Sequence, residues 1–278
     1  CILHEENLLE TLQNFLSGKT ISSMYLASLD NPVALSFFNP KRMQLFNFDD
    51  GSTSIIVPNM YTQNKNRIVS PLGLTLGQIM SLSQNHFTVF EKTELFEEGR
   101  QIPLCLDTKP VDFKRANNGQ TLRVFLGQAL GSVFDEEDIE VTKYLTQKAI
   151  QDCGADIYYP HPRVAIEIED VQVATPLKCF EEEIYDLLAE YEFVEVHGFY
   201  STSFIFAKEI EGVKVQGYRT FLSSFESDVL QNYGVQYKNI SLSDICVDIM
   251  MPVYNGVKTI DASIQSVLNQ THQQFRLW

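Results

Sequence analysis

Apolar and polar side chains alternate over short stretches of this chain of 278 residues, and turn-forming residues separate the stretches. A period of about two residues is typical of half-buried strands. In the first part of the chain the pattern predicts strands at residues 21–27, 43–48, 54–57 and 87–90, while the helices between them are less clearly marked. Residues 107–121, which include Pro110 and Gly119, are the best candidate for a linker.

Beyond this linker, strand patterns alternate with helical ones, which favours a parallel sheet covered by helices. The expected strands lie at residues 122–127, 157–159, 194–196 and 213–216, and the expected helices at residues 136–152 and 175–191, the second with Pro176 at its start. Residues 202–206 fit either a strand or a helix that begins at Ser201. We therefore expect two α/β halves, at residues 1–118 and 119–245.

Composition excludes few classes of function. The 44% of hydrophobic and 21% of charged residues are ordinary for a globular chain. The net charge of -15 and the pI near 4.7 argue against binding to nucleic acid or to an anionic membrane surface. Five cysteines, at positions 1, 105, 153, 179 and 246, lack CxxC spacing and predict reduced thiols. The sequence has no apolar run long enough to span a membrane, and it does not open with a basic segment followed by an apolar one. We therefore expect a cytoplasmic protein.

Two strand-end loops carry groups that can move a proton. Asp49, Asp50 and Gly51 follow the strand at residues 43–48, and His161 follows the strand at residues 157–159 between two prolines that stiffen its loop. Ligands of open α/β sheets collect beyond the carboxyl ends of strands, so a carboxylate and an imidazole could face each other across a cleft. Taken alone, each motif is more often an ordinary turn or loop. We assign no functional role to the other histidines, at positions 4, 86, 197 and 272.

A third element is the hydroxyl pair Ser201 and Thr202, which follows the apolar run at residues 193–199. Hydroxyls and free backbone N–H groups at such a position can bind a phosphate, although the pair by itself indicates only a turn. The ordered trio of motifs resembles the bacterial sialyltransferases of glycosyltransferase family 52, the lipooligosaccharide sialyltransferase group. The matching segments are residues 48–52, 124–128, 159–163 and 201–202, within a resemblance that covers about residues 20–240.

The resemblance implies an inverting, metal-independent transfer of sialic acid from CMP-sialic acid to a galactose-type hydroxyl of a surface glycan, in lipooligosaccharide or capsule biosynthesis. It implies a GT-B scaffold, in which residues 1–118 form the acceptor-side half and residues 119–245 the nucleotide-sugar half. No cofactor is expected. The implied roles are a base at Asp50 supported by Asp49 and Gly51, an acid at His161, and phosphate binding by Ser201, Thr202, Pro162 and Arg163.

Alternatives remain for the site and for the function. The acidic cluster at residues 135–138 could supply the base instead, although an acidic helix start is the commoner explanation. Arg163 could equally form an ion pair or cap a helix. The anionic donor also needs a locally positive pocket, for which the basic candidates are Lys41, Arg42, Lys65, Arg67, Arg163 and Arg219. Another sugar donor on a GT-B scaffold, or a non-catalytic glycan-assembly domain, would also fit.

Residues 247–256 and 260–271 resemble the opening of a family 2 glycosyltransferase, a GT-A domain. A single strand and helix cannot bury their own apolar face. We therefore expect residues 246–278 to be an incomplete domain of a longer bifunctional protein, with truncation at the amino end as well. The sequence leaves open whether this fragment is active. The expected partners are the CMP-sugar donor and a glycan or glycolipid acceptor, whose lipid would bring the protein to the inner membrane face. The resemblance also allows a homodimer.

Overall fold

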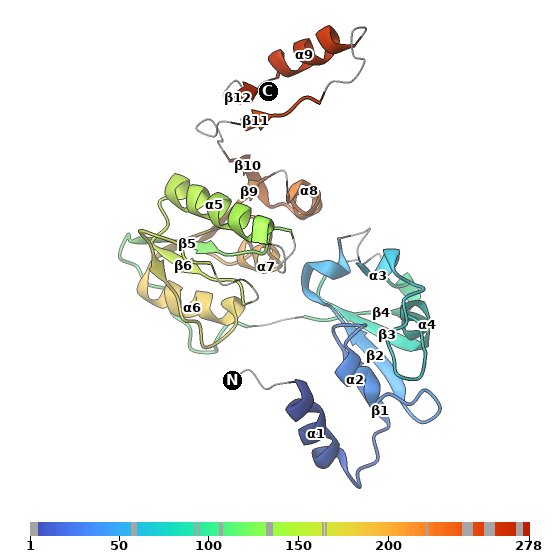
Figure 1. Ribbon diagram of the computed structural model, residues 1–278. Coiled ribbons are helices and arrows are strands. Elements are labelled where there is room, and N and C mark those ends of the chain that lie inside the picture. Colours follow the sequence, from blue (N-terminus) through green and yellow to red (C-terminus); the bar gives the residue numbers. More distant parts are fainter. Residues whose placement is uncertain are drawn as a thin grey trace.

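The computed structural model describes residues 5–56, 60–91, 93, 95–105, 108–131, 136–162, 164, 166–220, 222–240, 247–252, 259–270 and 275–278. Within these ranges the strands form sheets of four, six and two strands, and every pairing is parallel (Figure 1). The protein is therefore a mixed α/β protein. The domain limits expected at residues 118 and 245 stay predictions.

The four-stranded sheet has the order β1-β2-β3-β4. Its face that carries Leu26 and Leu45 packs against Leu76 and Ile79 of α4, which begins with a capping box formed by Thr75. The elements are α1 (Glu5–Leu16), β1 (Ser23–Leu26), α2 (Pro32–Ser36), β2 (Gln44–Phe48), α3 (Met60–Gln63), α4 (Leu76–Leu82), β3 (Ser83–Thr88) and β4 (Gln101–Pro103). β2 therefore lies between β1 and β3, so the loop after β2 can form hydrogen bonds with a neighbouring strand.

The six-stranded sheet has the order β10-β9-β8-β5-β6-β7 and apolar clusters on both faces. Its elements are β5 (Thr121–Leu126), α5 (Glu136–Cys153), β6 (Ile157–Tyr159), β7 (Gln172–Val173), α6 (Phe180–Glu190), β8 (Phe193–Gly198), α7 (Ser203–Ala207), β9 (Val213–Arg219), α8 (Ser224–Asn232) and β10 (Gln236–Asn239). The chain runs outward from β5 to β7 and then returns to β8 on the other side of β5. This reversal creates a crevice beyond the carboxyl ends of β5 and β8, where α/β proteins bind ligands.

The two larger sheets belong to units that share a hydrophobic core. Ile55, Ile56 and Phe90 come from loops of the first unit, and they are buried in the same cluster as Val124 and Leu188 of the second. The ring of Phe90 also meets the ring of Tyr233 edge-on, at 6.1 Å between centroids. Apolar burial of this kind is the dominant favourable term in association, so it holds the two units together in addition to the linker.

Several expected elements are confirmed, and the structure corrects others. The helix expected at residues 136–152 is α5, and that at residues 175–191 is α6, which starts only at Phe180, so Pro176 precedes the helix. The strand expected at residues 87–90 corresponds to β3, which begins four residues earlier than expected, at Ser83, and ends at Thr88. Residues 202–206 belong mainly to a helix, α7, so the strand alternative is wrong.

The strand expected at residues 54–57 is also wrong over its described part. Gly51–Ser54 form a 3₁₀ turn, and Ile55 and Ile56 follow as a buried turn, while residue 57 lies outside the described residues. An apolar run marks burial, and a short one does not reveal whether the backbone is extended.

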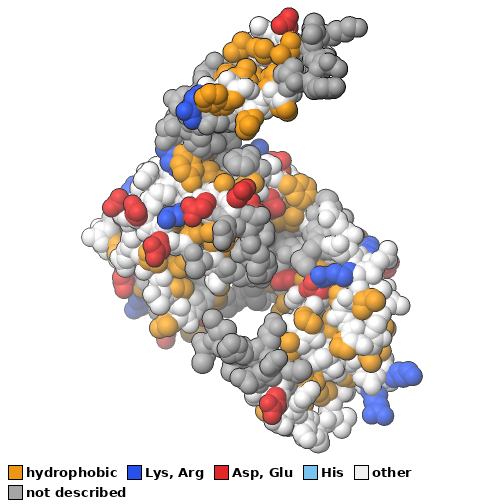
Figure 2. All heavy atoms as spheres, in the orientation of Figure 1, with side chains coloured by type: hydrophobic (Ala, Val, Ile, Leu, Met, Phe, Trp, Pro, Cys, Tyr) orange, Lys and Arg blue, Asp and Glu red, His pale blue; other side chains and the backbone are white. Residues whose placement is uncertain are grey.

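The last described elements are β11 (Val247–Ile249), α9 (Ile260–Leu268) and β12 (Phe275–Leu277), with β11 and β12 paired. Hydrophobic side chains lie on the surface of this unit (Figure 2), including Met250 at 82% and Trp278 at 68% exposure. Among the described helices of the chain, none combines the length and the apolar character needed to cross a bilayer.

The close approach of β5 and β8 predicts the effect of a methyl group at Gly198. A Cβ atom there would lie 2.8 Å from the Leu126 carbonyl oxygen and 3.0 Å from Cζ of Phe204. Gly198→Ala should therefore lower the free energy of unfolding, measured by urea denaturation, by about 1–3 kcal/mol. Gly99→Ala is the matched control, because a Cβ atom at Gly99 has no neighbour within 4 Å. Equal stabilities of the two variants would contradict the prediction.

The burial of His197 in β8 predicts a pH dependence of stability. His197 is 8% exposed, and neither ring nitrogen has a hydrogen-bond partner among the described residues. Burial lowers the pKa of His197 to about 4, although the Glu195 carboxylate, 3.8 Å from Nε2, favours the charged form. The unfolded chain binds a proton near pH 6.5, so the native state loses stability as the pH falls from about 6.5 to 4.

We expect this loss to reach the order of 3 kcal/mol, since one unit of pKa corresponds to about 1.4 kcal/mol. The measurement is the difference in unfolding free energy between the wild type and His197→Leu at pH 7 and at pH 4. Relative to His197→Leu, the wild type should be less stable at pH 4 than at pH 7 by this amount. A difference that stays constant over this range would show that His197 is not buried in its neutral form.

Candidate active site

A cavity of about 810 Å³ lies beyond the carboxyl ends of β5, β6 and β8. Its walls are residues from the loops after these three strands and from the segment before α6. Asp50, Gly51 and Thr53 from the turn after β2 complete the lining. The cavity is therefore built by both larger units, at the crevice where the strand order of the six-stranded sheet reverses.

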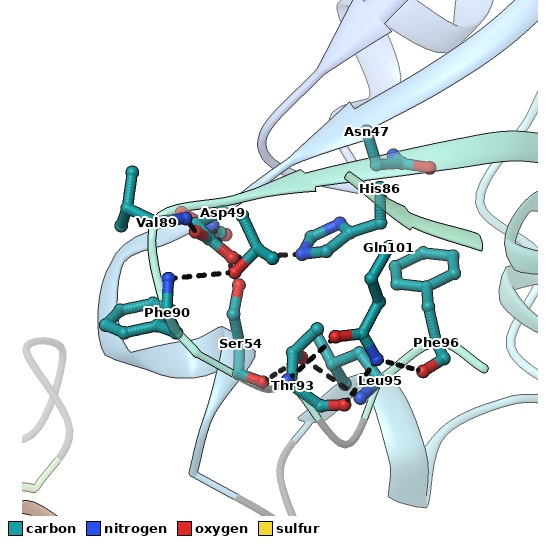
Figure 3. A network of polar contacts seen from close by, with 12 residues as sticks. Asn47, Asp49, Ser54, His86, Val89, Phe90, Thr93, Leu95, Phe96 and Gln101 are labelled. Atoms are coloured by element: carbon teal, nitrogen blue, oxygen red, sulfur yellow. Dashed lines mark hydrogen bonds and ion pairs between the residues drawn. The ribbon is translucent and has the colours of Figure 1, made fainter. Parts of the chain in front are cut away.

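Asp49, the first carboxylate after β2, is bound to the neighbouring strand β3 (Figure 3). Its Oδ1 lies 2.9 Å from Nε2 of His86, and its Oδ2 accepts the backbone N–H of Val89 at 2.7 Å. The Asp49 side chain is 10% exposed and that of His86 only 2%. His86 in turn stacks on the ring of Phe96, with 4.6 Å between centroids. Both oxygens of Asp49 are thus used to attach the loop to β3, and Asp49 is not among the cavity-lining residues.

Asp50, the second carboxylate, lines the cavity. Its Oδ2 accepts the hydroxyl hydrogen of Tyr61 at 2.5 Å, and its backbone N–H donates to Oγ of Ser54 at 3.2 Å. Burial and the hydrogen bond to Asp50 both raise the pKa of Tyr61 above its usual range, so Tyr61 stays a donor. Asp50 is therefore held through its backbone and through one of its two carboxylate oxygens.

A buried polar network supports the turn that carries Asp50 (Figure 3). The hydroxyl of Thr93 donates to the carbonyl oxygen of Ser54 and accepts the N–H of Leu95. Nε2 of Gln101 in β4 donates to the carbonyl oxygens of Thr93 and Phe96, at 2.9 and 2.7 Å. Ser54 and Thr93 are almost fully buried, and buried polar groups are costly to leave unpaired. The network therefore makes the position of Asp50 depend on the edge strand β4.

His161 and Pro162 lie in the loop after β6, and both line the cavity. A Cβ atom on Gly127, at the end of β5, would lie 2.6 Å from the Tyr158 hydroxyl and 3.0 Å from the His161 backbone nitrogen. The N–H of Gly127 donates to the Tyr159 carbonyl oxygen at 2.7 Å. A glycine at position 127 thus lets the loop with His161 approach the neighbouring strand closely. Arg163 lies outside the described residues.

Ser201 and Thr202 line the same cavity, directly before α7. Oγ of Ser201 accepts the N–H of Ser203 at 3.2 Å, which leaves the Ser201 hydroxyl hydrogen for donation. Thr202 faces Gly51, where a Cβ atom would lie 3.1 Å from Oγ1 of Thr202. Gly51 has a φ of 55°, which favours glycine, so the turn with Asp50 can approach the hydroxyl pair.

Positive charge near the cavity does not come from the expected residues that are described. Arg67 pairs with Asp30, and Arg219 pairs with Asp228. Lys178, which the sequence did not single out, lines the cavity, and its hydrogen bond with Asp186 raises its pKa. Long-chain residues outside regular elements give little signal of direction in a sequence, so Lys178 could not have been selected in advance.

The acidic cluster at residues 135–138 starts at a position outside the described residues. Glu137 and Asp138 lie in the first turn of α5, and neither is among the cavity-lining residues. The Asp138 carboxylate packs against Gly131, since a Cβ atom built on Gly131 would lie 2.5 Å from Oδ2 of Asp138. Gly131 itself lines the cavity. In the described part of the chain, no group of three or more His, Cys, Asp or Glu side chains is arranged to hold a metal ion.

One cavity thus brings together six of the residues selected from the sequence, namely Asp50, Gly51, His161, Pro162, Ser201 and Thr202. Tyr61 and His86, which contact the acidic pair, were missed. A strand predicted to start earlier, at residue 83, would have placed His86 beside the end of β2. No sequence signal links Tyr61 to Asp50, since their contact depends on how α3 packs.

One comparison with known proteins identifies a family for this chain. The family model described as "Glycosyltransferase family 52" matches residues 3–220. A solved structure described as "Crystal Structure Analysis of the Glycotransferase of kitacinnamycin" is 10% identical, with coverage of 96% of this chain and 73% of the other at a TM-score of 0.40. That likeness is too slight to carry an argument. The search of curated proteins gave no match.

The contact between Asp49 and β3 predicts a stability effect at His86. His86→Leu removes the ring nitrogen beside Oδ1 of Asp49 and leaves a nearly buried carboxylate oxygen unpaired. We expect the free energy of unfolding to fall by about 3 kcal/mol, because an unsatisfied charged group costs more than a neutral one. Gln84→Ala, at an exposed position of β3, should change it by less than about 0.5 kcal/mol. An unchanged stability of His86→Leu in urea denaturation would contradict the supporting role of Asp49.

Proposed function

Because the chain belongs to glycosyltransferase family 52, we propose that it transfers sialic acid from CMP-sialic acid to a galactoside hydroxyl of a surface glycan, in lipooligosaccharide or capsule biosynthesis. The observation that supports this proposal most strongly is the single cavity lined by Asp50 of one unit and by His161, Ser201 and Thr202 of the other. A base and an acid from opposite walls suit a reaction in which one proton is removed and another is supplied.

In the proposed reaction, Asp50 takes the proton of the acceptor hydroxyl, and the acceptor oxygen attacks the anomeric carbon of sialic acid. The bond from that carbon to the phosphate oxygen of CMP breaks on the opposite face, so the configuration inverts. His161 gives a proton to the departing phosphate or neutralises its charge. Asp50 ends the step protonated and returns its proton to solvent. Asp49 and Gly51 support the base, Asp49 through its contact with β3 and Gly51 through its close approach to Thr202.

The phosphate of CMP would be bound by the hydroxyls of Ser201 and Thr202 and by backbone N–H groups, with Pro162 and Arg163 contributing from the loop after β6. The leaving group is a monophosphate, whose charge such donors and one imidazole can balance. The proposed mechanism therefore needs no metal ion and no cofactor. Lys178 is the lysine of the described cavity lining, and it is paired with Asp186.

The proposed scaffold is GT-B, with the four-stranded sheet on the acceptor side and the six-stranded sheet on the nucleotide-sugar side. The shared core around Ile55, Ile56 and Phe90, which sets the two units against each other, supports it. We also propose that the unit formed by β11, α9 and β12 corresponds to the opening of a family 2 glycosyltransferase, that the protein works at the inner membrane face on a lipid-linked acceptor, and that it forms a homodimer.

The test is the release of CMP from CMP-sialic acid in the presence of a galactoside acceptor. Asp50→Asn and His161→Ala should each lower kcat by at least about 100-fold, since a general base or acid contributes 10²–10⁴-fold. Asp228→Asn and His197→Leu are the matched controls, because neither residue lines the cavity. Circular dichroism checks that each variant is folded.

Three results would count against the proposal. Wild-type rates in folded Asp50→Asn would show that Asp50 is not the base. Turnover of another sugar nucleotide in place of CMP-sialic acid would show that the donor is a different one. Binding of CMP without turnover by the unaltered chain would instead favour a non-catalytic role in glycan assembly.

A further inference from the structure

The two neighbouring carboxylates of the site are used differently. Both oxygens of Asp49 are bound, one by His86 and the other by the N–H of Val89. Oδ2 of Asp50 is bound by Tyr61. The contact described for the Asp50 carboxylate falls on Oδ2, and Asp50 lines the cavity, whereas Asp49 does not. Asp50 is therefore the member of the pair that can accept a proton from a bound ligand.

The direction of the bond between Tyr61 and Asp50 follows from the available hydrogens. The Tyr61 hydroxyl oxygen lies 2.5 Å from Oδ2 of Asp50 and 3.4 Å from Oγ of Ser28. The Ser28 hydroxyl gives its own hydrogen to Oδ1 of Asp30 at 2.9 Å. The single hydrogen of Tyr61 therefore points to Asp50, in the short geometry of a charge-assisted bond.

Packing keeps the Tyr61 hydroxyl in this place. Tyr61 is 1% exposed, and its ring belongs to the core cluster that contains Leu29, Leu35 and Leu76. A buried ring packed at the density of a protein interior cannot turn away without opening a cavity. The backbone of Asp50 is held independently, by the bond from its N–H to Ser54. Both ends of the contact are thus fixed before any ligand binds.

We propose that Tyr61 is a positioning residue of this site, which holds Oδ2 of Asp50 so that Oδ1 is presented to the acceptor hydroxyl. The inference rests on the proposed function, in which Asp50 is the base. A hydrogen bond to the charged form of a carboxylate favours that form, so a pH profile is a readout that responds to this contact.

The other charged groups around this contact are few among the described residues. Burial is the largest cause of the raised pKa of Tyr61, and the negative charges of Asp50 and Asp30 raise it further. Asp30 is paired with Arg67. Asp49 precedes Asp50 in the chain and contacts His86 of β3. His161 and Lys178 line the same cavity as Asp50. None of these groups is changed by replacing Tyr61 with phenylalanine, so a shift in the pH profile would report the hydroxyl alone.

The experiment is the pH profile of kcat/KM for CMP release by the full chain carrying Tyr61→Phe. We expect the acid limb to move to higher pH by about one unit, because the charged form of the base has lost a donor. Tyr218→Phe is the matched control, since Tyr218 is also buried and donates to a carboxylate, Oδ2 of Asp152 at 2.7 Å, away from the cavity. Its acid limb should not move. A merely structural role of Tyr61 would lower the rate equally at every pH.

Replacement of Tyr61 by 3-fluorotyrosine keeps the shape of the ring, so it serves if Tyr61→Phe fails to fold. Fluorotyrosine is the stronger donor, so its acid limb should move to lower pH. An unmoved acid limb in a folded Tyr61 variant, together with an inactive Asp50→Asn, would overturn this inference and leave the proposed function standing. An active Asp50→Asn would overturn both, because the base itself would then lie elsewhere.

Discussion

The burial of Ile55, Ile56 and Phe90 in the core of the second unit is the constraint on which the candidate site depends. These residues directly follow the two segments that hold the acidic pair, the turn with Asp50 and the end of β3 that binds Asp49. Apolar contact between the units and the position of the carboxylates are therefore set by the same short stretches of chain. A change that loosened this core would move Asp50 relative to the wall that carries His161.

The acidic pair illustrates how neighbouring residues of one type take different roles. Asp49 is attached to β3 by both oxygens, so its contribution is the position of the loop. Asp50 is attached through Oδ2 and lines the cavity. The network of Ser54, Thr93 and Gln101 then carries the support to the edge strand, so Asp50 sits on a turn that is fixed at several points. Such support suits catalysis, since a carboxylate must be aimed to within a fraction of an ångström.

Electrostatics sets a second requirement. The chain has a net charge of -15, and the proposed donor is also an anion. The described cavity lining offers His161 and the hydroxyls of Ser201 and Thr202 to balance it, while Lys178 is paired with Asp186. Hydroxyls and backbone N–H groups add donors without adding formal charge, which lets an acidic protein bind a phosphate through local geometry. The family assignment over residues 3–220 and this local chemistry point to the same class of reaction.

The sequence by itself determined the family, the α/β class and the residue types that line the cavity. Asp50, His161 and Ser201 could be selected because each follows an apolar run, and the end of a strand is visible as a change of pattern. Only the tertiary structure decided that Ile55 and Ile56 form a buried turn rather than a strand, and that Phe180 rather than Pro176 opens α6. It also decided which carboxylate is attached to β3, and that Tyr61 meets Asp50. The physical reason is that periodicity reports whether a side chain is buried, whereas its partner depends on the packing of segments that lie far apart in the chain.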